Sequence, residues 1–271
     1  MPAFPSALRH PRFALAPLAV ACLLSAACGG AQPAAAPAGG PAADSGPVKP
    51  KVDRVVLSVV PPASESNELR QLVQTELWQM RPMNEYLIGV DTSNGKFIPQ
   101  LATKWSLEPD GKSWRFTLRQ GIQFHNGFGE MTGEDVRHTW RDIVQEDSQP
   151  QYAAQFRRWV EDVEMPGKYE VVFKNRVPDG NFLLATSEQE AGFEIRSKAS
   201  AEKDGVPTMQ GRPVAATGPY QFAERAQGQY LRFKRPDGQH WRATPEFPEF
   251  EFRWQKEAST RLASLLSGEV H

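Results

Sequence analysis

The sequence predicts an α+β fold with a mixed sheet, in a body that runs from about residue 51 to residue 271. β-branched and aromatic runs are interspersed with amphipathic stretches, but they do not alternate as regular strand–helix–strand units. No internal repeat is visible. Charged residues make up 23% and aromatic residues 10% of the chain, values that are typical of a folded globular protein. The 31 basic and 32 acidic side chains nearly cancel, which argues against a nucleic-acid partner.

Residues 1–28 are predicted to be a lipoprotein-type signal peptide. Three residues supply a positive region at its start: Arg9, His10 and Arg12. Residues 13–27 are apolar but too few to span a bilayer comfortably, and they end in two alanines before Cys28, which resembles a bacterial lipobox. We therefore predict that Cys28 is lipidated. Ser25 stands where leucine is preferred, so ordinary signal peptidase cleavage with an unmodified Cys28 is the alternative.

Residues 29–50 consist almost wholly of alanine, proline and glycine. Such a composition cannot pack a core and is typical of a semi-extended tether. We predict a tether between a membrane anchor and a folded domain at 51–271. The two cysteines of the chain, Cys22 and Cys28, both lie in the leader. The folded domain can therefore hold neither a disulfide nor a thiolate metal site.

The folded domain begins with a predicted strand and a predicted helix. Residues 52–60 form a β-branched run that predicts a buried strand, and Pro61 and Pro62 end it. The polar cluster at 64–67 suits the start of a helix. The apolar residues that follow recur at helical spacing and predict one buried helix face: Leu69, Leu72, Val73 and Leu77.

A short strand at 86–90, a turn at 91–95 and a hairpin at 105–119 are predicted next. The hairpin turn is the sequence Glu-Pro-Asp-Gly, in which proline fixes φ and glycine accepts a positive φ. The second hairpin segment alternates in polarity, which places three apolar side chains on one face: Trp114, Phe116 and Leu118.

Thr132 and Asp135 form a predicted capping box that opens a second helix. Its apolar side carries four residues: Val136, Trp140, Ile143 and Val144. Further strands are predicted at 169–174, 220–223, 230–234 and 250–254. The last predicted helix begins near Ser259 and stops at Gly268, and it carries three leucines: Leu262, Leu265 and Leu266.

The sequence lacks the motifs of the common reaction centres. It contains no nucleophile elbow, P-loop, dinucleotide-binding glycine motif or zinc-protease motif. The five histidines show no ligand spacing: His10, His125, His138, His240 and His271. The adjacent acids Glu161 and Asp162 are interpreted as solvated helix residues rather than as an acid–base pair. We therefore predict a binding protein without metal or cofactor rather than an enzyme, and a hydrolase is a remote third hypothesis.

Four motifs follow one another in the first half of the folded domain: PQLATKW at 99–105, PDGKSWRFTLR at 109–119, GIQFHNG at 121–127 and MTGEDV at 131–136. Two later motifs are ATGPY at 216–220 and RLASLLSGEV at 261–270. Their order and residue patterns resemble those of the family 5 extracellular solute-binding proteins of bacterial ABC importers. This family captures oligopeptides, dipeptides or nickel complexes. The resemblance covers the chain from about Val52 to its last residue.

The sequence departs from the family pattern at a few positions. Asn126 replaces an aspartate, Ser264 an alanine and His271 a final aspartate, and residues 128–131 replace the usual connection. We expect Asn126 and the 128–131 segment to be loop variations. Structural roles, rather than ligand contacts, are expected for three residues of the motifs: Trp114, His125 and Gly127.

The resemblance implies lobe I of a two-lobe fold like that of the class II, or cluster C, periplasmic binding proteins. In this fold the ligand lies between two lobes that hinge shut and bury it. Family members are considerably longer and continue into the second lobe after the segment that here reads GEV at 268–270. We therefore expect residues 51–271 to be an incomplete solute-binding domain, with the second lobe missing. A fragment, a truncated gene product and a one-lobe remnant are the three alternatives.

The resemblance also implies the function, which is that of an importer receptor for peptides. Such a receptor holds an oligopeptide or dipeptide as an added strand and delivers it to a permease and its ATPase subunits. The expected location is the periplasm or the outer face of the membrane, through a lipid anchor. Expected ligand contacts are Ala63, Ser64 and Glu65 after the first strand, and Tyr152, whose alternative role is packing. A receptor for a nickel complex or another small solute, and a surface lipoprotein that lost transport, are the alternatives.

Overall fold

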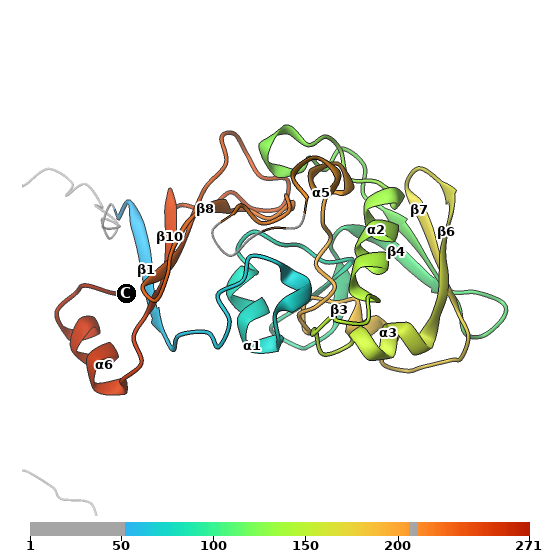
Figure 1. Cartoon of the computed structure of the whole chain (residues 1–271). Coiled ribbons are helices and arrows are strands. Elements are labelled where there is room, and N and C mark those ends of the chain that lie inside the picture. Colours follow the sequence, from blue (N-terminus) through green and yellow to red (C-terminus); the bar gives the residue numbers. More distant parts are fainter. Residues whose placement is uncertain (1–51, 206, 208–210) are drawn as a thin grey trace, which may run out of the picture. The chain divides into compact units, whose positions relative to one another are not determined.

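In the part of the chain that the structure describes, the strands form three sheets (Figure 1). The computed structural model describes residues 52–205, 207 and 211–271. The predicted signal peptide at 1–28, with Cys28, and the predicted tether at 29–50 lie outside the described residues. Within the described ranges, no helix is both long enough and apolar enough to cross a membrane. The arrangement of helices and strands confirms the α+β class with a mixed sheet.

The mixed sheet has the strand order β1-β10-β9-β8. Its strands are β1 (Arg54–Val59), β8 (Gln221–Ala226), β9 (Tyr230–Lys234) and β10 (Glu249–Trp254). β1 lies parallel to β10, whereas the β10–β9 and β9–β8 pairs are antiparallel. In Figure 1 the blue β1 therefore lies beside the red-orange β10, although the paired residues Arg54 and Glu249 are 195 positions apart in the sequence.

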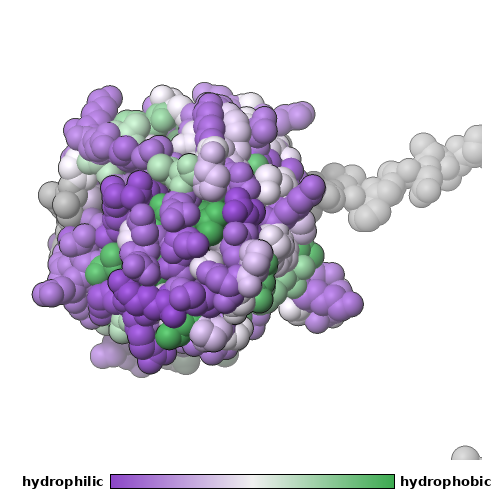
Figure 2. All heavy atoms as spheres, turned by 90° about the vertical axis from the view of Figure 1, so that its right-hand side faces the viewer, coloured by the Kyte–Doolittle hydropathy of each residue, from purple (hydrophilic) through white to green (hydrophobic). Residues whose placement is uncertain are grey.

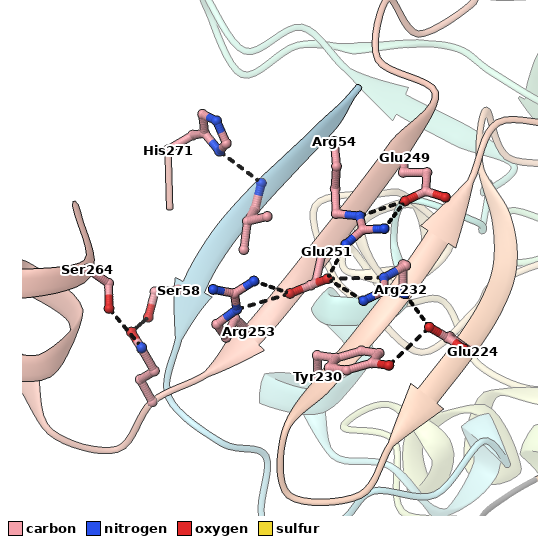
Figure 3. A network of polar contacts seen from close by, with 12 residues as sticks. Arg54, Ser58, Glu224, Tyr230, Arg232, Glu249, Glu251, Arg253, Ser264 and His271 are labelled. Atoms are coloured by element: carbon pink, nitrogen blue, oxygen red, sulfur yellow. Dashed lines mark hydrogen bonds and ion pairs between the residues drawn. The ribbon is translucent and has the colours of Figure 1, made fainter. Parts of the chain in front are cut away.

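The two faces of the mixed sheet differ because successive side chains of a strand point to opposite sides. One face is apolar and packs against the core: Leu57, Val59, Leu231, Phe233, Phe250, Phe252 and Trp254. The opposite face carries arginine and glutamate side chains. At its centre lies Glu251, which is 1% exposed and is surrounded by Arg54, Arg232 and Arg253 (Figure 3).

An antiparallel sheet with the order β4-β5-β7-β6 forms a second core. Its strands are β4 (Ala102–Leu107), β5 (Trp114–Leu118), β6 (Val160–Gly167) and β7 (Glu170–Asn175). Helices α2 (Gly133–Ile143) and α3 (Ala153–Trp159) pack against β6. Edge-to-face contacts join three aromatic rings of this core, Phe116, Phe173 and Phe182. The surface seen in Figure 2 is mainly hydrophilic, with scattered apolar side chains.

Short elements connect the two larger sheets. β2 (Ile88–Val90) and β3 (Phe97–Pro99) form a two-stranded sheet. Other short helices are α4 (Phe182–Ala185), α5 (Lys198–Asp204) and a 3-10 turn at His125–Gly127.

The last helix, α6 (Ala258–Leu266), confirms the bounds expected from the sequence. Its three leucines do not enter the core, since Leu262, Leu265 and Leu266 are 57%, 52% and 80% exposed. Beyond α6 the chain returns to the edge of β1. The His271 N–H donates to the Val56 carbonyl at 2.9 Å, and the Val56 N–H donates to His271 Nδ1 at 3.2 Å (Figure 3).

The hairpin turn and the capping box form as predicted. In the hairpin turn, the Asp110 carboxylate accepts the N–H groups of Lys112 and Ser113, and Gly111 has a φ of 70°. At the start of α2, Thr132 Oγ1 accepts the Glu134 N–H and the Asp135 carboxylate accepts the Thr132 N–H. These local sequence signals therefore specified the local structure.

The single helix predicted after residues 64–67 is wrong. Three short helices replace it: a 3-10 turn at Leu69–Gln71, α1 at Gln74–Leu77 and a 3-10 turn at Trp78–Met80. Leu72 is extended, and Val73 is 43% exposed instead of buried. The Glu68 and Glu76 carboxylates accept backbone N–H groups, so each caps the start of a separate helix.

The interpretation of Glu161 and Asp162 as helix residues is also wrong, because both lie in β6. The pairing of β6 with β7 is irregular at two places, between Val160 and Asp162 and between Glu164 and Gly167. These irregularities interrupt the alternation of buried and exposed side chains that identifies a strand in a sequence.

Candidate functional site

The loop that follows β1, residues 60–68, contains three of the predicted ligand contacts, and we call it the β1 loop. Pro61 and Pro62 end the strand as expected, since proline cannot donate to a strand ladder. The loop lies between α1 on one side and the turn that joins β8 to β9 on the other, and hydrogen bonds attach it to both.

The carboxylate of Glu76 attaches the β1 loop to α1. Its Oε1 accepts the N–H groups of Ala63 at 3.0 Å and Ser64 at 3.3 Å, and its Oε2 accepts the Val73 N–H at 2.8 Å. Glu76 is 4% exposed, so these hydrogen bonds are shielded from water. Bonds between backbone N–H groups and an ionised carboxylate are stronger than neutral ones, and they fix the conformation of Ala63 and Ser64.

The carboxylate of Glu65 attaches the loop to the β8–β9 turn. Its two oxygens lie 3.0 and 3.1 Å from the N–H nitrogen of Gly228, which donates to them. Within the loop, Ser64 Oγ accepts the Ser66 N–H at 3.4 Å, and Ser66 Oγ accepts the Glu68 N–H at 3.0 Å. The inner side of the loop is therefore held by side-chain acceptors along most of its length.

Arg225 of β8 lies beneath the loop. Its Nη2 donates to the Ser66 carbonyl at 3.4 Å and to Asn67 Oδ1 at 2.8 Å, and its guanidinium stacks over the Trp254 ring at 5.5 Å. Burial lowers the pKa of Arg225 to about 10, and the negative charge of Glu65 opposes this shift. The guanidinium remains charged at neutral pH and is directed into the protein.

Three apolar side chains of the β1 loop and of the short helices that follow it are partly exposed. Val60 is 56%, Val73 43% and Trp78 39% exposed, and Trp78 packs edge-on against Phe252 with ring centroids 5.3 Å apart. The cavity beneath the loop measures about 10 Å³, which leaves room for no more than one water molecule. The space beneath the loop is therefore too small for a peptide or another organic ligand.

Tyr152, the fourth predicted contact, lies elsewhere in the fold. It precedes α3, and its ring lies 6.0 Å from that of Trp159, against the core of the antiparallel sheet. Among the described residues, no hydrogen bond or ring contact joins Tyr152 to the β1 loop. The structure brings Ala63, Ser64 and Glu65 together, and it leaves Tyr152 in a separate cluster.

The predicted structural role of the histidine motif agrees with its contacts. His125 is 7% exposed, and its Nε2 donates to the Gly218 carbonyl at 2.8 Å. Burial lowers the pKa of the imidazole, which favours the neutral ring. At Gly218 a Cβ atom would lie under 3.0 Å from backbone atoms of Met83 and Asn84, so only glycine fits. The GIQFHNG and ATGPY motifs therefore meet in one packed contact.

A second hollow, of about 490 Å³, lies beside His125 and is lined also by His240 and Trp241. Next to it, the fully buried Glu85 accepts a hydrogen bond from Trp241 Nε1 at 3.0 Å and pairs with Arg242 at 3.2 Å. These contacts hold the β9–β10 connection in place. The described part of the chain contains no group of three histidine, cysteine or carboxylate side chains that could hold a metal ion.

The sequence did not point to Glu76 or Arg225. Glu76 lies in a run that was read as one continuous helix, and the capping position before it is Val73, which is not a capping residue type. Arg225 reaches the loop from a strand 158 residues away in the sequence. Neither contact has a local sequence signal.

Comparison with known proteins decides the family. The profile of the bacterial extracellular solute-binding proteins, family 5 Middle, matches residues 96–271, more than half of the chain. The chain belongs to this family. Its members are binding proteins rather than enzymes, which confirms the prediction made from the missing catalytic motifs.

The peptide transport periplasmic protein SapA of Salmonella typhimurium strain LT2 is 29% identical to this family 5 protein over 201 residues, which cover 68% of this chain and 36% of SapA. A dipeptide-binding protein from Pseudoalteromonas sp. SM9913, in complex with Met-Leu, has a TM-score of 0.70 at 20% identity. The match covers 80% of this chain and 46% of the Pseudoalteromonas chain. NikZ from Campylobacter jejuni, in complex with Ni(L-His), also has a TM-score of 0.70, at 19% identity. This match covers 80% of this chain and 42% of the NikZ chain.

The structural likeness at these identities shows the fold, which is that of the periplasmic binding proteins of this family. The chain spans about a third of the length of SapA and less than half of each of the two solved proteins. The described residues thus correspond to part of a longer architecture.

Proposed function

We propose that this family 5 protein provides the first lobe of an extracytoplasmic receptor that captures peptides for an ABC importer. The observation that carries the proposal is the β1 loop, a segment that hydrogen bonds hold to α1 and to the β8–β9 turn, with the exposed apolar side chains of Val60 and Val73 at its start and beside α1. An extended peptide binds such a surface through its backbone, while apolar side chains contact the flank. The named ligands of SapA and of the Pseudoalteromonas protein are peptides, which supports this choice.

The proposed ligand contacts are Ala63, Ser64 and Glu65. Ala63 and Ser64 act through their main chain, because Glu76 fixes their conformation. Glu65 contributes negative charge at the loop surface. Tyr152 contacts the core of the antiparallel sheet, which favours its alternative role in packing over a role in ligand contact.

The proposed partners are the permease and ATPase subunits of the importer. The proposed location is the periplasm or the outer face of the membrane. Lipidation of Cys28 and a tether at 29–50 would keep the receptor near the permease, since a flexible linker raises the effective concentration of the domain that it holds.

A nickel complex is the second candidate ligand, and the likeness to NikZ in complex with Ni(L-His) favours it. The described ranges of the chain contain no cluster of side chains that could hold a metal ion on its own. Nickel would therefore bind as a preformed complex with a small chelator, and free nickel would not bind at this site.

Thermal unfolding of the full chain with candidate ligands tests the proposal. A ligand that binds the folded state raises Tm in proportion to the logarithm of its concentration. We expect dipeptides and short oligopeptides to raise Tm, and free sugars and free Ni²⁺ to leave it unchanged. A shift with nickel–histidine alone would favour the second candidate, and a panel without any shift would contradict both.

Two matched variants locate the binding surface. Val73→Arg places a bulky charge on the apolar flank of the β1 loop, at a side chain that is 43% exposed. Leu107→Arg makes the same change on β4, where the side chain is 48% exposed. We expect the first variant to lose the response to peptides and the second to keep it. Equal responses would show that peptides bind elsewhere.

A further inference from the structure

The chain contains two Asn-Gly dipeptides, at positions 94–95 and 126–127, and both asparagines are exposed. Asparagine is a thermolabile residue, because a main-chain nitrogen can attack the carbon of its side-chain amide. A following glycine favours this attack, since its backbone is flexible and it has no side chain to hinder the approach. The two dipeptides therefore share the same intrinsic chemistry, and the fold decides which of them can react.

Hydrogen bonds hold both reacting groups of the first dipeptide. Asn94 Nδ2 donates to Asp91 Oδ2 at 2.7 Å, and Asn94 Oδ1 accepts the Lys96 N–H at 2.9 Å. The Gly95 nitrogen, which would make the attack, donates to the Asp91 carbonyl at 2.7 Å. These bonds must break before the nitrogen can reach the side chain, so the folded structure protects Asn94.

The side chain of the second asparagine is not held in this way. In the part of the chain that the structure describes, no residue forms a hydrogen bond with the Asn126 side chain. An attack by the Gly127 nitrogen requires rotation of the peptide group between the two residues. At Gly127 and at Gly129 an added Cβ atom would meet no other atom within 4 Å, so no packing on these residues opposes the rotation.

The backbone of Asn126 also favours a change of conformation. Its φ is 60° and its ψ is 21°, and it is the one non-glycine residue with a positive φ within the described ranges. Residues with a Cβ atom are less stable in this left-handed region than in the extended or right-handed regions. Rotation away from the observed conformation therefore leads Asn126 towards more favourable backbone angles.

We propose that Asn126 is a site of spontaneous deamidation, whereas hydrogen bonds protect Asn94 from the same reaction. The Gly127 nitrogen forms a bond to Asn126 Cγ, the Cγ–Nδ2 bond breaks, and the side-chain nitrogen leaves as ammonia with the hydrogen that the Gly127 nitrogen loses. Water then opens the resulting succinimide ring at either of its carbonyl groups, which leaves aspartate or isoaspartate. The reaction consumes one water and needs no oxidant, reductant or cofactor. The inference is independent of the proposed function.

The two products differ in their effect on the turn. Aspartate tolerates a positive φ as asparagine does, so this product keeps the turn and adds one negative charge. Position 126 lines the hollow of about 490 Å³ together with His125 and His240, so the charge enters a hollow that holds two imidazoles. Isoaspartate lengthens the main chain inside a segment that is closed by the hydrogen bond from the Phe124 N–H to the Gly129 carbonyl at 2.8 Å. This product should therefore weaken the turn.

Peptide mapping of the full chain by mass spectrometry, during incubation at mildly alkaline pH, tests the inference. Exchange of the amide for a carboxyl group raises the mass of the peptide, and isotopically labelled water marks the groups that form during the incubation. We expect Asn126 to deamidate at least about fivefold faster than Asn94 in the folded chain, because fewer hydrogen bonds must break. In the chain unfolded by urea the two rates should agree within about twofold, since the fold no longer separates the two sites.

Three variants connect the rates to the fold. Asp91→Ala removes the acceptor of Asn94 Nδ2 and should raise the rate at Asn94 at least about threefold. Asn126→Gln keeps an amide but requires a larger ring, so the mass change at this position should disappear. Asn94→Gln is the matched control, and it should leave the rate at Asn126 unchanged.

Equal rates at the two asparagines of the folded chain, or a faster rate at Asn94, would overturn the inference. It would also be overturned if Asn126 remained intact in the folded chain while the unfolded chain reacted, since the turn would then protect it. A rate at Asn94 that does not respond to Asp91→Ala would overturn the proposed protection of Asn94 by its hydrogen bonds.

Discussion

Replacing Glu251 by glutamine tests whether the polar face of the mixed sheet stabilises the fold. Glu251 Oε2 accepts hydrogen bonds from Arg232 at 2.9 and 3.0 Å, and Oε1 accepts them from Arg253 at 2.9 and 3.1 Å (Figure 3). Arg54 lies 3.5 Å from the same carboxylate. Glutamine keeps the shape of the side chain, removes its charge and directs an amide donor at an arginine.

The expected loss of stability follows from the exposure of the partners. Removing one member of a fully buried ion pair costs about 3–5 kcal/mol, whereas an exposed pair contributes about 0.2–1 kcal/mol. The Glu251 side chain is 1% exposed, but those of Arg54, Arg232 and Arg253 are 36%, 19% and 33% exposed, so water can solvate the released arginines. We therefore expect Glu251→Gln to lower the free energy of unfolding by about 2–3 kcal/mol.

Urea unfolding followed by circular dichroism measures this loss. With a slope of about 2–3 kcal/mol per molar urea, the unfolding midpoint should fall by about 1 M. Glu224→Gln is the control, because Glu224 pairs with Arg232 on the same face but is 50% exposed, and it should cost about 0.5 kcal/mol. The reasoning is refuted if both variants lose the same amount.

Three further predictions concern other parts of the fold. Gly218→Ala should cost more than about 3 kcal/mol or prevent folding, since the new methyl group meets the Met83 backbone, and thermal unfolding measures this. Thr132→Ala should lower the free energy of unfolding in urea by about 1 kcal/mol through loss of the α2 cap, and Thr132→Ser should restore most of it. Burial lowers the pKa of His125, so below the unfolded value of about 6.5 the unfolded chain binds a proton that the folded chain lacks, and stability falls as the pH drops. His125→Gln should therefore reduce the loss of Tm between pH 6.5 and pH 5, and an unchanged pH profile would contradict this.

The parts of the fold that the sequence predicted correctly are those with local signals. Strands β1, β9 and β10 are apolar or alternating runs that fit a half-buried sheet, and β9 was predicted at its observed bounds. The hairpin turn and the α2 cap contain residues whose backbone preferences or side-chain acceptors act within four positions. In these places neighbours along the chain decide the structure, so a pattern of a few residues is sufficient.

The predictions failed where contacts distant in sequence decide the structure. The segment from Leu69 to Met80 has helical spacing, but the Glu76 carboxylate, which also accepts the N–H groups of Ala63 and Ser64 in the β1 loop, starts a new helix within it. The site was expected at Ala63–Glu65 through the family resemblance, and the residues that shape it, Glu76 and Arg225, could not be deduced from spacing. The link from Glu65 to Gly228 spans 163 positions, a distance over which a single sequence contains no pairing signal.

The parallel pairing of β1 with β10 affects the order in which the molecule can fold. The antiparallel sheet uses strands between residues 102 and 175, whereas β1 pairs with a strand almost two hundred positions away, so its closing loop is long and its pairing is slow. Of the described strands, β1 is made first during synthesis and its partner β10 is made last. The contacts that join the β1 loop to Arg225 and Gly228 form late for the same reason, so the proposed binding surface can form only after β8 and β9 have joined the mixed sheet.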